Sequence, residues 1–422
     1  MKVFSEFFIA ARYLWGKGRG GGRYLKGAAI GIALSLVPIM VTLIVADGMI
    51  QGITDRYLEL GTGHIQVYDY FSSNAGEFPA LPELPGLRGA WKERSGLAVI
   101  MGSGGKAGAA VRATETSFWT DAGSRRFLKV IEGSAELEGA NEVLLGEELA
   151  RSVGAETGKT VYIMSVHANT SAASGASIPR TLPFKVKGII SSGYRELDAL
   201  WCVLSYSGGE RLLDPAFSQD YLMLKIDDPY RKADATASIL AAELGAPYSV
   251  YTWKDLQRSQ YSSYESTRQL LLFIMALIVL VAAVNVSSAT GMLVIDRRQD
   301  IAVLKAAGAS PAATSRIFLC AGFFTGLGGV IAGSASGLLI GYFINQLIRG
   351  LEAALSFFTS LFHGGEVRIL DSGYYLEVIP IIINWKTVAF IGLFTLLCSV
   401  LASWFPARRA GKIPPIEILR KI

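Results

Sequence analysis

Charged residues are scarce in this chain of 422 residues. Asp, Glu, Lys and Arg make up 18% of it, whereas 51% of the residues are hydrophobic. A soluble globular protein carries about 25% charged residues. The deficit is concentrated in a few long stretches, which excludes both a simple soluble enzyme and a disordered chain.

Cysteine and histidine are scarce as well. Three cysteines exclude a disulfide scaffold, and Cys202 is alone in the polar part of the chain because Cys320 and Cys398 lie in apolar runs. The three histidines are far apart and lack the spacing of metal ligands. No acid–base pair or nucleophile triad stands out. The sequence therefore predicts a non-catalytic chain without a metal site or a cofactor of its own.

Long apolar runs are what the chain has instead. Four segments without Asp, Glu, Lys or Arg cover residues 27–46, 269–295, 317–348 and 387–407. Each reaches the ~20 residues that a helix needs to cross a hydrocarbon core of ~30 Å. The first run and the segment before it are too long for a cleaved signal peptide. We therefore predict four transmembrane helices.

The distribution of charge predicts their orientation. Residues 1–26, 296–316 and 405–422 together carry fifteen Lys or Arg against four Asp or Glu, a balance of +11, whereas residues 51–267 have 21 basic and 26 acidic residues, a balance of −5. The positive-inside rule places the three basic segments in the cytoplasm. The overall charge of +5 is thus a topology signal and predicts no nucleic-acid partner.

This reasoning gives a multi-pass membrane protein with both termini in the cytoplasm and a 1 + 3 arrangement of helices around a large exported domain, called the periplasmic domain below. The predicted segments are a cytoplasmic N-terminal segment 1–26, transmembrane helix 27–50, a periplasmic domain 51–267, transmembrane helix 268–295, a cytoplasmic loop 296–316, transmembrane helix 317–348, a periplasmic loop 349–386, transmembrane helix 387–405 and a cytoplasmic tail 406–422.

The periplasmic domain has the pattern of an α+β fold. Helical patterns over 146–153 and 231–244 intervene between short apolar or alternating runs that are typical of strands. From Trp253 to Ile295 no proline occurs, so one helix could start near Asp255 and run through the second span. Residues 167–180 indicate a hairpin tip or loop. The strand-like runs are 64–70, 107–113, 142–145, 160–166, 184–190, 199–206, 221–226 and 248–253.

Three fragments imitate an ATPase. Residues 154–160 (GAETGKT) resemble a phosphate loop but have three residues between the glycines instead of four. Residues 207–210 (SGGE) resemble the signature of ABC ATPases, and 221–228 (YLMLKIDD) resemble a magnesium-binding strand, although Lys225 interrupts it. All three lie in the exported segment, where ATP is scarce. We interpret 154–160 as a helix-to-strand turn and 221–226 as an edge strand.

Several motifs make the chain resemble the FtsX/MacB-type ABC transporter permeases. Residues 8–14 (FIAARYL), 46–49 (ADGM) and 64–67 (HIQV) are similar to the opening of that family. Residues 284–288 (VNVSS) and 296–310 (DRRQDIAVLKAAGAS) are similar to its second span and coupling loop. The C-terminal signature corresponds to 404–410 (WFPARRA) and 414–419 (PPIEIL). Residues 374–380 (YYLEVIP) resemble the lipoprotein-releasing LolC/LolE branch.

The coupling loop itself predicts a short amphipathic helix over 300–308. Gly308 is suited to end it, and Pro311 follows. A helix lying on lipid headgroups is the alternative to a docking helix. The resemblance implies docking, with Leu304 pointing into a cleft of the ATPase, Ile301 beside it and Lys305 on the exposed polar side. The residues expected to couple the chain to the ATPase are Arg297, Arg298, Asp300, Ile301, Leu304, Lys305 and Gly308.

Glycines recur at every fourth position of the third span, at Gly329, Gly333, Gly337 and Gly341. Such spacing lets two helix backbones approach closely inside a membrane. The pattern predicts packing, either within the subunit or between permease subunits. In the second span, Asn285 is interpreted as an interhelical hydrogen-bonding residue rather than as part of a substrate path.

The resemblance implies a permease subunit of the mechanotransmission type in the bacterial inner membrane, with the large exported domain in the periplasm. A separate cytoplasmic ABC ATPase dimer would bind ATP and Mg²⁺, and its motion would release lipoproteins from the outer leaflet of the inner membrane. The expected partners are that ATPase, a second permease subunit, identical or homologous, the lipoprotein cargo and a periplasmic lipoprotein carrier. Two alternatives remain open: MacB-like extrusion of a peptide or small molecule, and FtsX-like signalling to a periplasmic cell-wall hydrolase.

Overall fold

The computed structural model describes residues 8–10, 21–69, 78–168, 177–361 and 379–414. It divides into two compact units. The first unit comprises Met1–Ile50, Tyr264–Val367 and Ile379–Ile422, and the second comprises Gln51–Ser263 and Arg368–Val378. The chain passes from one unit to the other inside two long helices.

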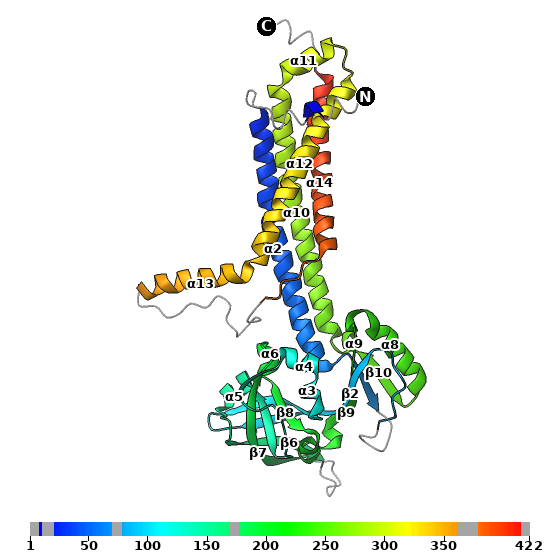
Figure 1. The fold of residues 1–422 in the computed structure, drawn as a ribbon, viewed down its shortest axis with the longest axis vertical. Helices are drawn as coiled ribbons and strands as arrows, with labels where there is room; N and C mark the ends of the chain where they lie inside the picture. Colours follow the sequence, from blue (N-terminus) through cyan, green and yellow to red (C-terminus); the bar gives the residue numbers. More distant parts are fainter. Residues whose placement is uncertain (1–7, 11–20, 70–77, 169–176, 362–378, 415–422) are drawn as a thin grey trace. The chain divides into compact units, whose positions relative to one another are not determined.

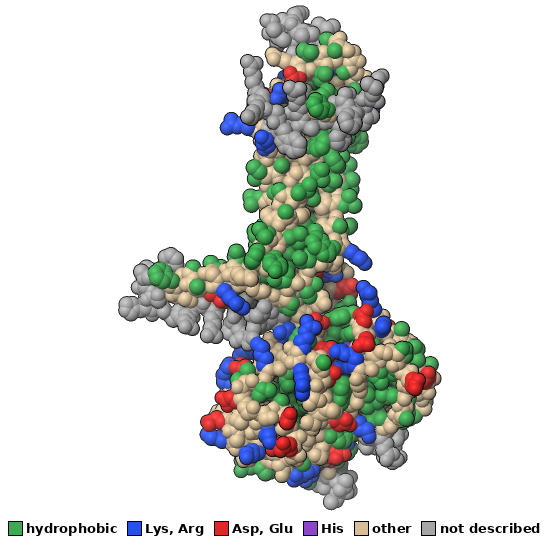
Figure 2. Space-filling view, in the orientation of Figure 1, with side chains coloured by type: hydrophobic (Ala, Val, Ile, Leu, Met, Phe, Trp, Pro, Cys, Tyr) green, Lys and Arg blue, Asp and Glu red, His purple; other side chains and the backbone are tan. Residues whose placement is uncertain are grey.

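The first unit is a bundle of helices. Four of them are long and apolar enough to cross a membrane: α2 (Gly21–Arg56), α10 (Arg258–Asp296), α12 (Pro311–Tyr342) and α14 (Trp385–Lys412). The prediction of four candidate spans is therefore confirmed by length and composition. On the face shown in Figure 2, hydrophobic side chains cover the bundle, as expected for helices in contact with lipid.

Two shorter helices also belong to this unit, α11 (Arg298–Ala306) and α13 (Ile344–Leu361). α11 lies between α10 and α12 in sequence, and α13 begins directly after α12 (Figure 1). The third apolar run was predicted to span 317–348, but its helix ends at Tyr342 because the backbone leaves helical geometry at Phe343. The expected loop 349–386 therefore contains most of α13.

The second unit is built on a mixed sheet of ten described strands, in the order β10-β1-β9-β2-β3-β8-β5-β7-β4, with β6 pairing with β2 and β7. The pairs β3–β8 and β5–β7 are parallel, and the other pairs are antiparallel. The strands are β1 (Ile65–Asp69), β2 (Leu87–Met101), β3 (Lys106–Thr114), β4 (Lys129–Gly133), β5 (Glu142–Gly146), β6 (Thr160–Ala168), β7 (Ser177–Ser191), β8 (Trp201–Ser205), β9 (Ser218–Ile226) and β10 (Tyr248–Thr252).

Short helices cover both faces of this sheet. One apolar core lies under Leu149 of α5 and Leu212 of α7, and another lies under Leu240 of α8. The opposite face packs against Phe118 of α3 and Leu60 of η1. The elements are η1 (Tyr57–Thr62, a π-helix), α3 (Ser117–Thr120), α4 (Ala122–Phe127), α5 (Glu147–Val153), α6 (Arg195–Asp198), α7 (Tyr206–Leu212), η2 (Pro215–Phe217), α8 (Pro229–Leu244) and α9 (Trp253–Leu256).

Two local predictions are wrong. Residues 221–226 were expected at an edge of the sheet, but β9 pairs with β1 on one side and β2 on the other. One helix was expected from Asp255 onward, but α9 ends at Leu256. Gln257 has φ −108° and ψ 27°, and α10 begins after it. The turn over 154–160 is confirmed, because α5 ends at Val153 and β6 begins at Thr160.

Candidate functional site

The short helix predicted over 300–308 is present as α11, over Arg298–Ala306, and Gly308 lies just beyond its end. Gly308 has φ +95°, a left-handed conformation that suits glycine. The amide of Gly308 donates to the Lys305 carbonyl at 3.0 Å and that of Ala309 to the Leu304 carbonyl at 2.9 Å. These bonds close the C-terminus of α11. Pro311 then starts α12 one residue after the Ser310 cap.

The inner face of α11 is docked onto the chain's own helices. Ile301 is fully buried and belongs to a cluster with Leu293 of α10, Phe318 of α12 and Ala407 of α14. Leu304 is half-buried against the same cluster. Leu304 was expected to point into a cleft of the ATPase with Ile301 beside it. In the structure Ile301 instead fills the space under the helix, and Leu304 packs partly on the same cluster.

Lys305 is also used within the chain. Its Nζ donates to the carbonyls of Gly411 and Ile413, both at 2.7 Å, at the end of α14. A lysine placed at the C-terminus of a helix satisfies carbonyls that have no partner inside that helix. The expectation that Lys305 lies on a free polar side is wrong. This side chain fastens α11 to α14.

The outer face of α11 remains open. Val303 is 60% exposed, and Arg298 is exposed as well. Asp300 is half-exposed and forms an ion pair with Arg297, with 3.2 Å between Asp300 Oδ2 and Arg297 Nη1. Val303 and Arg298 are therefore not covered by the described chain, in contrast to Ile301 on the inner face.

The glycine stripe of α12 faces α2. A Cβ on Gly329 would lie 2.7 Å from the Cβ of Ile32, one on Gly333 2.8 Å from that of Leu36, and one on Gly337 2.7 Å from that of Met40; Gly341 faces Ile44. Of the two kinds of packing that the sequence left open, these contacts lie within the chain. At Gly329 and Gly333 backbone atoms of α2 also lie within 2.9 Å of the added Cβ, so the two helices approach too closely there for a side chain.

Asn285 of α10 does not take part in packing within the described bundle. It is exposed, as are Ser288 and Val284 near it. No bond from Asn285 to another described helix is observed, so the interpretation of a hydrogen bond within the chain is not supported. Polar contacts between α10 and α14 are made instead by Thr290 and Ser403, with 3.4 Å between their hydroxyl oxygens, and by Arg268, whose Nη2 donates to Thr387 Oγ1 at 3.3 Å.

A buried lysine in the second unit was missed as a structural centre. Lys225 of β9 is fully buried, with its Nζ 2.9 Å from Asp121 Oδ2, 3.2 Å from Glu59 Oε2 and 2.7 Å from Ser124 Oγ. Burial lowers the pKa of Lys225 below its ordinary value, although both carboxylates oppose this effect. Burial alone would raise the pKa of Asp121, but the Lys225 ammonium holds it below its ordinary value.

The contacts of Lys225 with Glu59, Asp121 and Ser124 hold η1, which follows α2 without a break, against the sheet. Glu59 comes from η1, and Arg112 of β3 donates to the carbonyl of Leu60 in the same turn. Arg112 also forms a bidentate ion pair with the buried Glu93, at 2.6 and 2.7 Å. π-helical turns occur frequently at functional sites. The sequence signal for this centre is a lysine inside an apolar strand, which argues against a magnesium site but does not identify the partners of the lysine.

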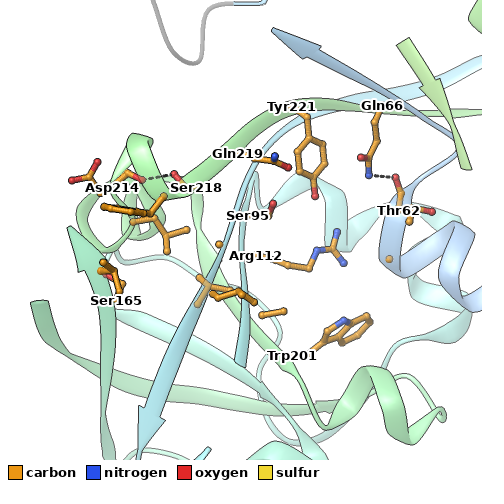
Figure 3. A pocket seen from close by; sticks show the side chains of 18 of the residues that line it. Thr62, Gln66, Ser95, Arg112, Ser165, Trp201, Asp214, Ser218, Gln219 and Tyr221 are labelled. Carbon is orange, nitrogen blue, oxygen red and sulfur yellow. Dashed lines mark hydrogen bonds between the residues drawn. The ribbon is translucent and has the colours of Figure 1, made fainter. Parts of the chain in front are cut away.

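A cavity of about 890 Å³ opens on the sheet beside η1 (Figure 3). Arg112, Tyr221 and Trp201 lie along one part of it, and Ser165, Asp214 and Ser218 along another. The charge on Arg112 is already neutralised by Glu93, to which the Tyr221 hydroxyl also donates at 2.5 Å. Among the described residues, no group of three or more His, Cys, Asp or Glu side chains is arranged to hold a metal ion.

Two family profiles match the chain. The profile of the MacB-like periplasmic core domain matches residues 27–242, and that of the FtsX-like permease C-terminal domain matches residues 272–415. The chain therefore belongs to the FtsX/MacB-type ABC transporter permeases. Four apolar helices and a periplasmic core domain make it a multi-pass inner-membrane protein.

Its relatives include lipoprotein-releasing system transmembrane proteins. The chain is 28% identical to LolC of Neisseria meningitidis, over 99% of this chain and 100% of that protein. It is 28% identical to LolC of Xylella fastidiosa, over 98% of each chain. It is 24% identical to LolE of Haemophilus influenzae, over 98% of this chain and 99% of the relative. The resemblance to the LolC/LolE branch, inferred from short motifs, is thus confirmed along the full chain.

Proposed function

We propose that this chain is the permease subunit of an ABC transporter that releases lipoproteins from the outer leaflet of the inner membrane. A separate cytoplasmic ATPase dimer supplies the energy and holds the ATP and Mg²⁺. The names of the full-length relatives support the cargo class. The basic segments at both termini and around α11 support a cytoplasmic location for them and a 1 + 3 arrangement of the spans.

The observation that carries the coupling role is the two-sided character of α11. Its inner face is fixed by Ile301 and by the two bonds of Lys305, whereas Val303 on the outer face is exposed. A force applied to the outer face therefore moves α10, α12 and α14 together, since all three contribute to the cluster around Ile301. This is the behaviour that mechanotransmission requires.

The exposed side of α10 supports a second permease subunit. Asn285 and Ser288 are exposed within a helix apolar enough to span a membrane. Polar side chains in a span usually face another helix or a water-filled cavity rather than lipid. We assign this side of α10 to the partner permease, identical or homologous, or to the path that the cargo follows between the two.

A further proposal, which rests on the family resemblance, is that residues 167–180 between β6 and β7 dock the periplasmic lipoprotein carrier. The described part of the β6–β7 hairpin pairs from Thr160↔Lys185 to Ala168↔Ser177, and residues 169–176 lie outside the described residues. A long hairpin that extends from the sheet suits contact with a periplasmic lipoprotein carrier. Residues 374–378 of the branch motif also lie outside the described residues.

Purification from native membranes in mild detergent tests the proposal. We expect an ATPase, a second permease and an acylated protein to co-purify with the full-length chain. An outer-membrane duct with a small-molecule cargo would instead favour extrusion, and a cell-wall hydrolase without an acylated cargo would favour signalling. Either result would contradict lipoprotein release.

A further inference from the structure

The helix α13 has one apolar side and one polar side. Its apolar residues recur at intervals of three and four, which places them in a single stripe along the helix. The intervening positions are mostly polar. The apolar stripe consists of Ile344, Leu347, Ile348, Leu351 and Leu355, and the polar side includes Asn345, Gln346, Arg349, Glu352, Ser356 and Thr359.

The apolar stripe is largely uncovered by the described chain. Leu347 is 56% exposed and Leu351 is 52% exposed, whereas Ile344, at the start of the helix, is 9% exposed. The start of α13 therefore packs on the bundle, whereas Leu347 and Leu351 are left largely uncovered. The rest of the stripe needs another apolar surface, because exposed leucines in a row are unfavourable in water.

Two aromatic residues mark where the bilayer ends. Tyr342 at the end of α12 and Trp385 at the start of α14 are 56% and 66% exposed. α12 and α14 run in opposite directions, since Gly322 faces Ser403 and Val330 faces Gly392. The two aromatic side chains therefore belong to the same end of the bundle. Exposed Tyr and Trp are typical of the membrane–water interface.

α13 starts at this interface. A single residue, Phe343, separates it from α12, and Figure 1 shows it running outward from the end of α12 rather than continuing along it. Asn345 holds the returning chain at the same place: its Nδ2 donates to the Ile379 carbonyl at 3.0 Å, and the Ile379 amide donates to its Oδ1 at 3.2 Å. The start of α13 is thus fixed to the bundle.

We propose that α13 lies in the plane of the exported leaflet, with Leu347, Leu351 and Leu355 inserted at the boundary between headgroups and acyl chains. The lipid that covers α12 continues under α13, because the two helices are consecutive. Arg349 and Glu352 on the other side argue against a fifth span. At 18 residues, α13 reaches about 27 Å from the bundle. It braces the permease against tilting and displaces the lipids beside it.

Fluorescence quenching by lipid tests the proposal on the full-length chain. Cys202, Cys320 and Cys398 are replaced by alanine, and an environment-sensitive fluorophore is attached to Leu351→Cys or, as the matched control, to Glu352→Cys. The proteins are placed in nanodiscs whose lipids carry bromine on the acyl chains. We expect strong quenching and a blue shift at 351 and at least threefold weaker quenching at 352. The pair Leu355→Cys and Ser356→Cys repeats the comparison one turn later.

Equal quenching at 351 and 352, or none at either, would refute the in-plane helix. Quenching at 351 that disappears when a second permease is assembled beside it would show that the stripe is a protein interface, and would refute the proposal too. Ile331→Cys, on the exposed side of α12, is the positive control. Loss of quenching there would contradict the membrane assignment itself rather than the position of α13.

Discussion

Gly333→Ala tests the close approach of α12 to α2. The added Cβ would lie 2.8 Å from Leu36 Cβ and 2.9 Å from the Cα and carbonyl oxygen of Ala33. Carbon atoms in contact prefer about 3.5–4.0 Å, so the two helices must separate by roughly 1 Å or deform. Two of the three neighbouring atoms belong to the backbone and cannot rotate away. Inserting a methyl group into such a site costs about 1–3 kcal/mol.

Two matched variants in the same helix set the scale. Gly328 is exposed and a Cβ there would meet nothing within 4 Å, so Gly328→Ala should stabilise the helix by about 0.5–1 kcal/mol. At Gly341 the nearest atom is the Cδ1 of Ile44, the far end of a flexible side chain. Gly341→Ala should therefore cost less than Gly333→Ala.

The assay is the unfolding free energy of the full-length protein in one detergent, measured for all three variants. We expect the order of stability Gly328→Ala, then Gly341→Ala, then Gly333→Ala. If Gly333→Ala is as stable as Gly328→Ala, α2 and α12 do not pack through these glycines, and the description of the bundle is wrong.

Three further predictions concern two polar contacts and the place where Ile379 and Pro380 cross Gly48 of α2. Lys305→Met should lower the unfolding free energy by about 1.5–3 kcal/mol, because two hydrogen bonds from a charged donor to α14 are lost. The control is Lys412→Met, at an exposed position near the end of α14. Equal effects of the two variants would contradict the docking of α11 on α14. Asp121→Asn should destabilise the second unit at neutral pH, and progressively less as the pH falls below 3.8, the ordinary pKa of an aspartate. In the folded protein the pKa of Asp121 is lowered. The stabilisation by its carboxylate is therefore present above pH 3.8 and is lost as the pH falls through the lowered pKa. Tryptophan fluorescence during unfolding measures this, and a pH-independent difference would refute it. Gly48→Ala should reduce recovery of folded protein, because its Cβ would collide with the Pro380 carbonyl. The control is Gly31→Ala, where a Cβ meets nothing within 4 Å. Equal recovery of the two variants would show that Pro380 does not cross α2 at Gly48.

The sequence predicted those strands whose apolar residues are contiguous or alternate, such as β6 and β7. It missed β2, because Lys92, Glu93 and Arg94 interrupt the pattern. Their charges are compensated by residues far away in the sequence: Arg94 pairs with Asp220 at 2.6 Å, and Glu93 pairs with Arg112. A charged residue inside a strand cannot be recognised as buried until its partner is known.

In the candidate site, too, local features could be predicted from the sequence, whereas contacts with distant residues could not. The glycine spacing predicted close helix packing, but a pattern in one helix does not identify the helix it meets. The C-terminal end of α11 could be predicted approximately, because Gly308 and Pro311 act locally, but its start at Arg298 could not. The directions of Ile301 and Lys305 could not, because both depend on the ends of α10 and α14, which approach α11 only in the folded bundle.

The coupling role of α11 is tested most directly by Val303→Asp in the full-length protein. Val303 is exposed, so the variant should fold and reach the membrane at normal levels. An unpaired carboxylate at a contact with the ATPase costs several kcal/mol, and every ~1.4 kcal/mol is a tenfold change in association. We expect the ATPase to be lost from the purified complex, or its ATP hydrolysis to stop responding to cargo, whereas Val303→Ala should retain both. If Val303→Asp retains the ATPase and releases cargo at the normal rate, α11 does not couple the two proteins.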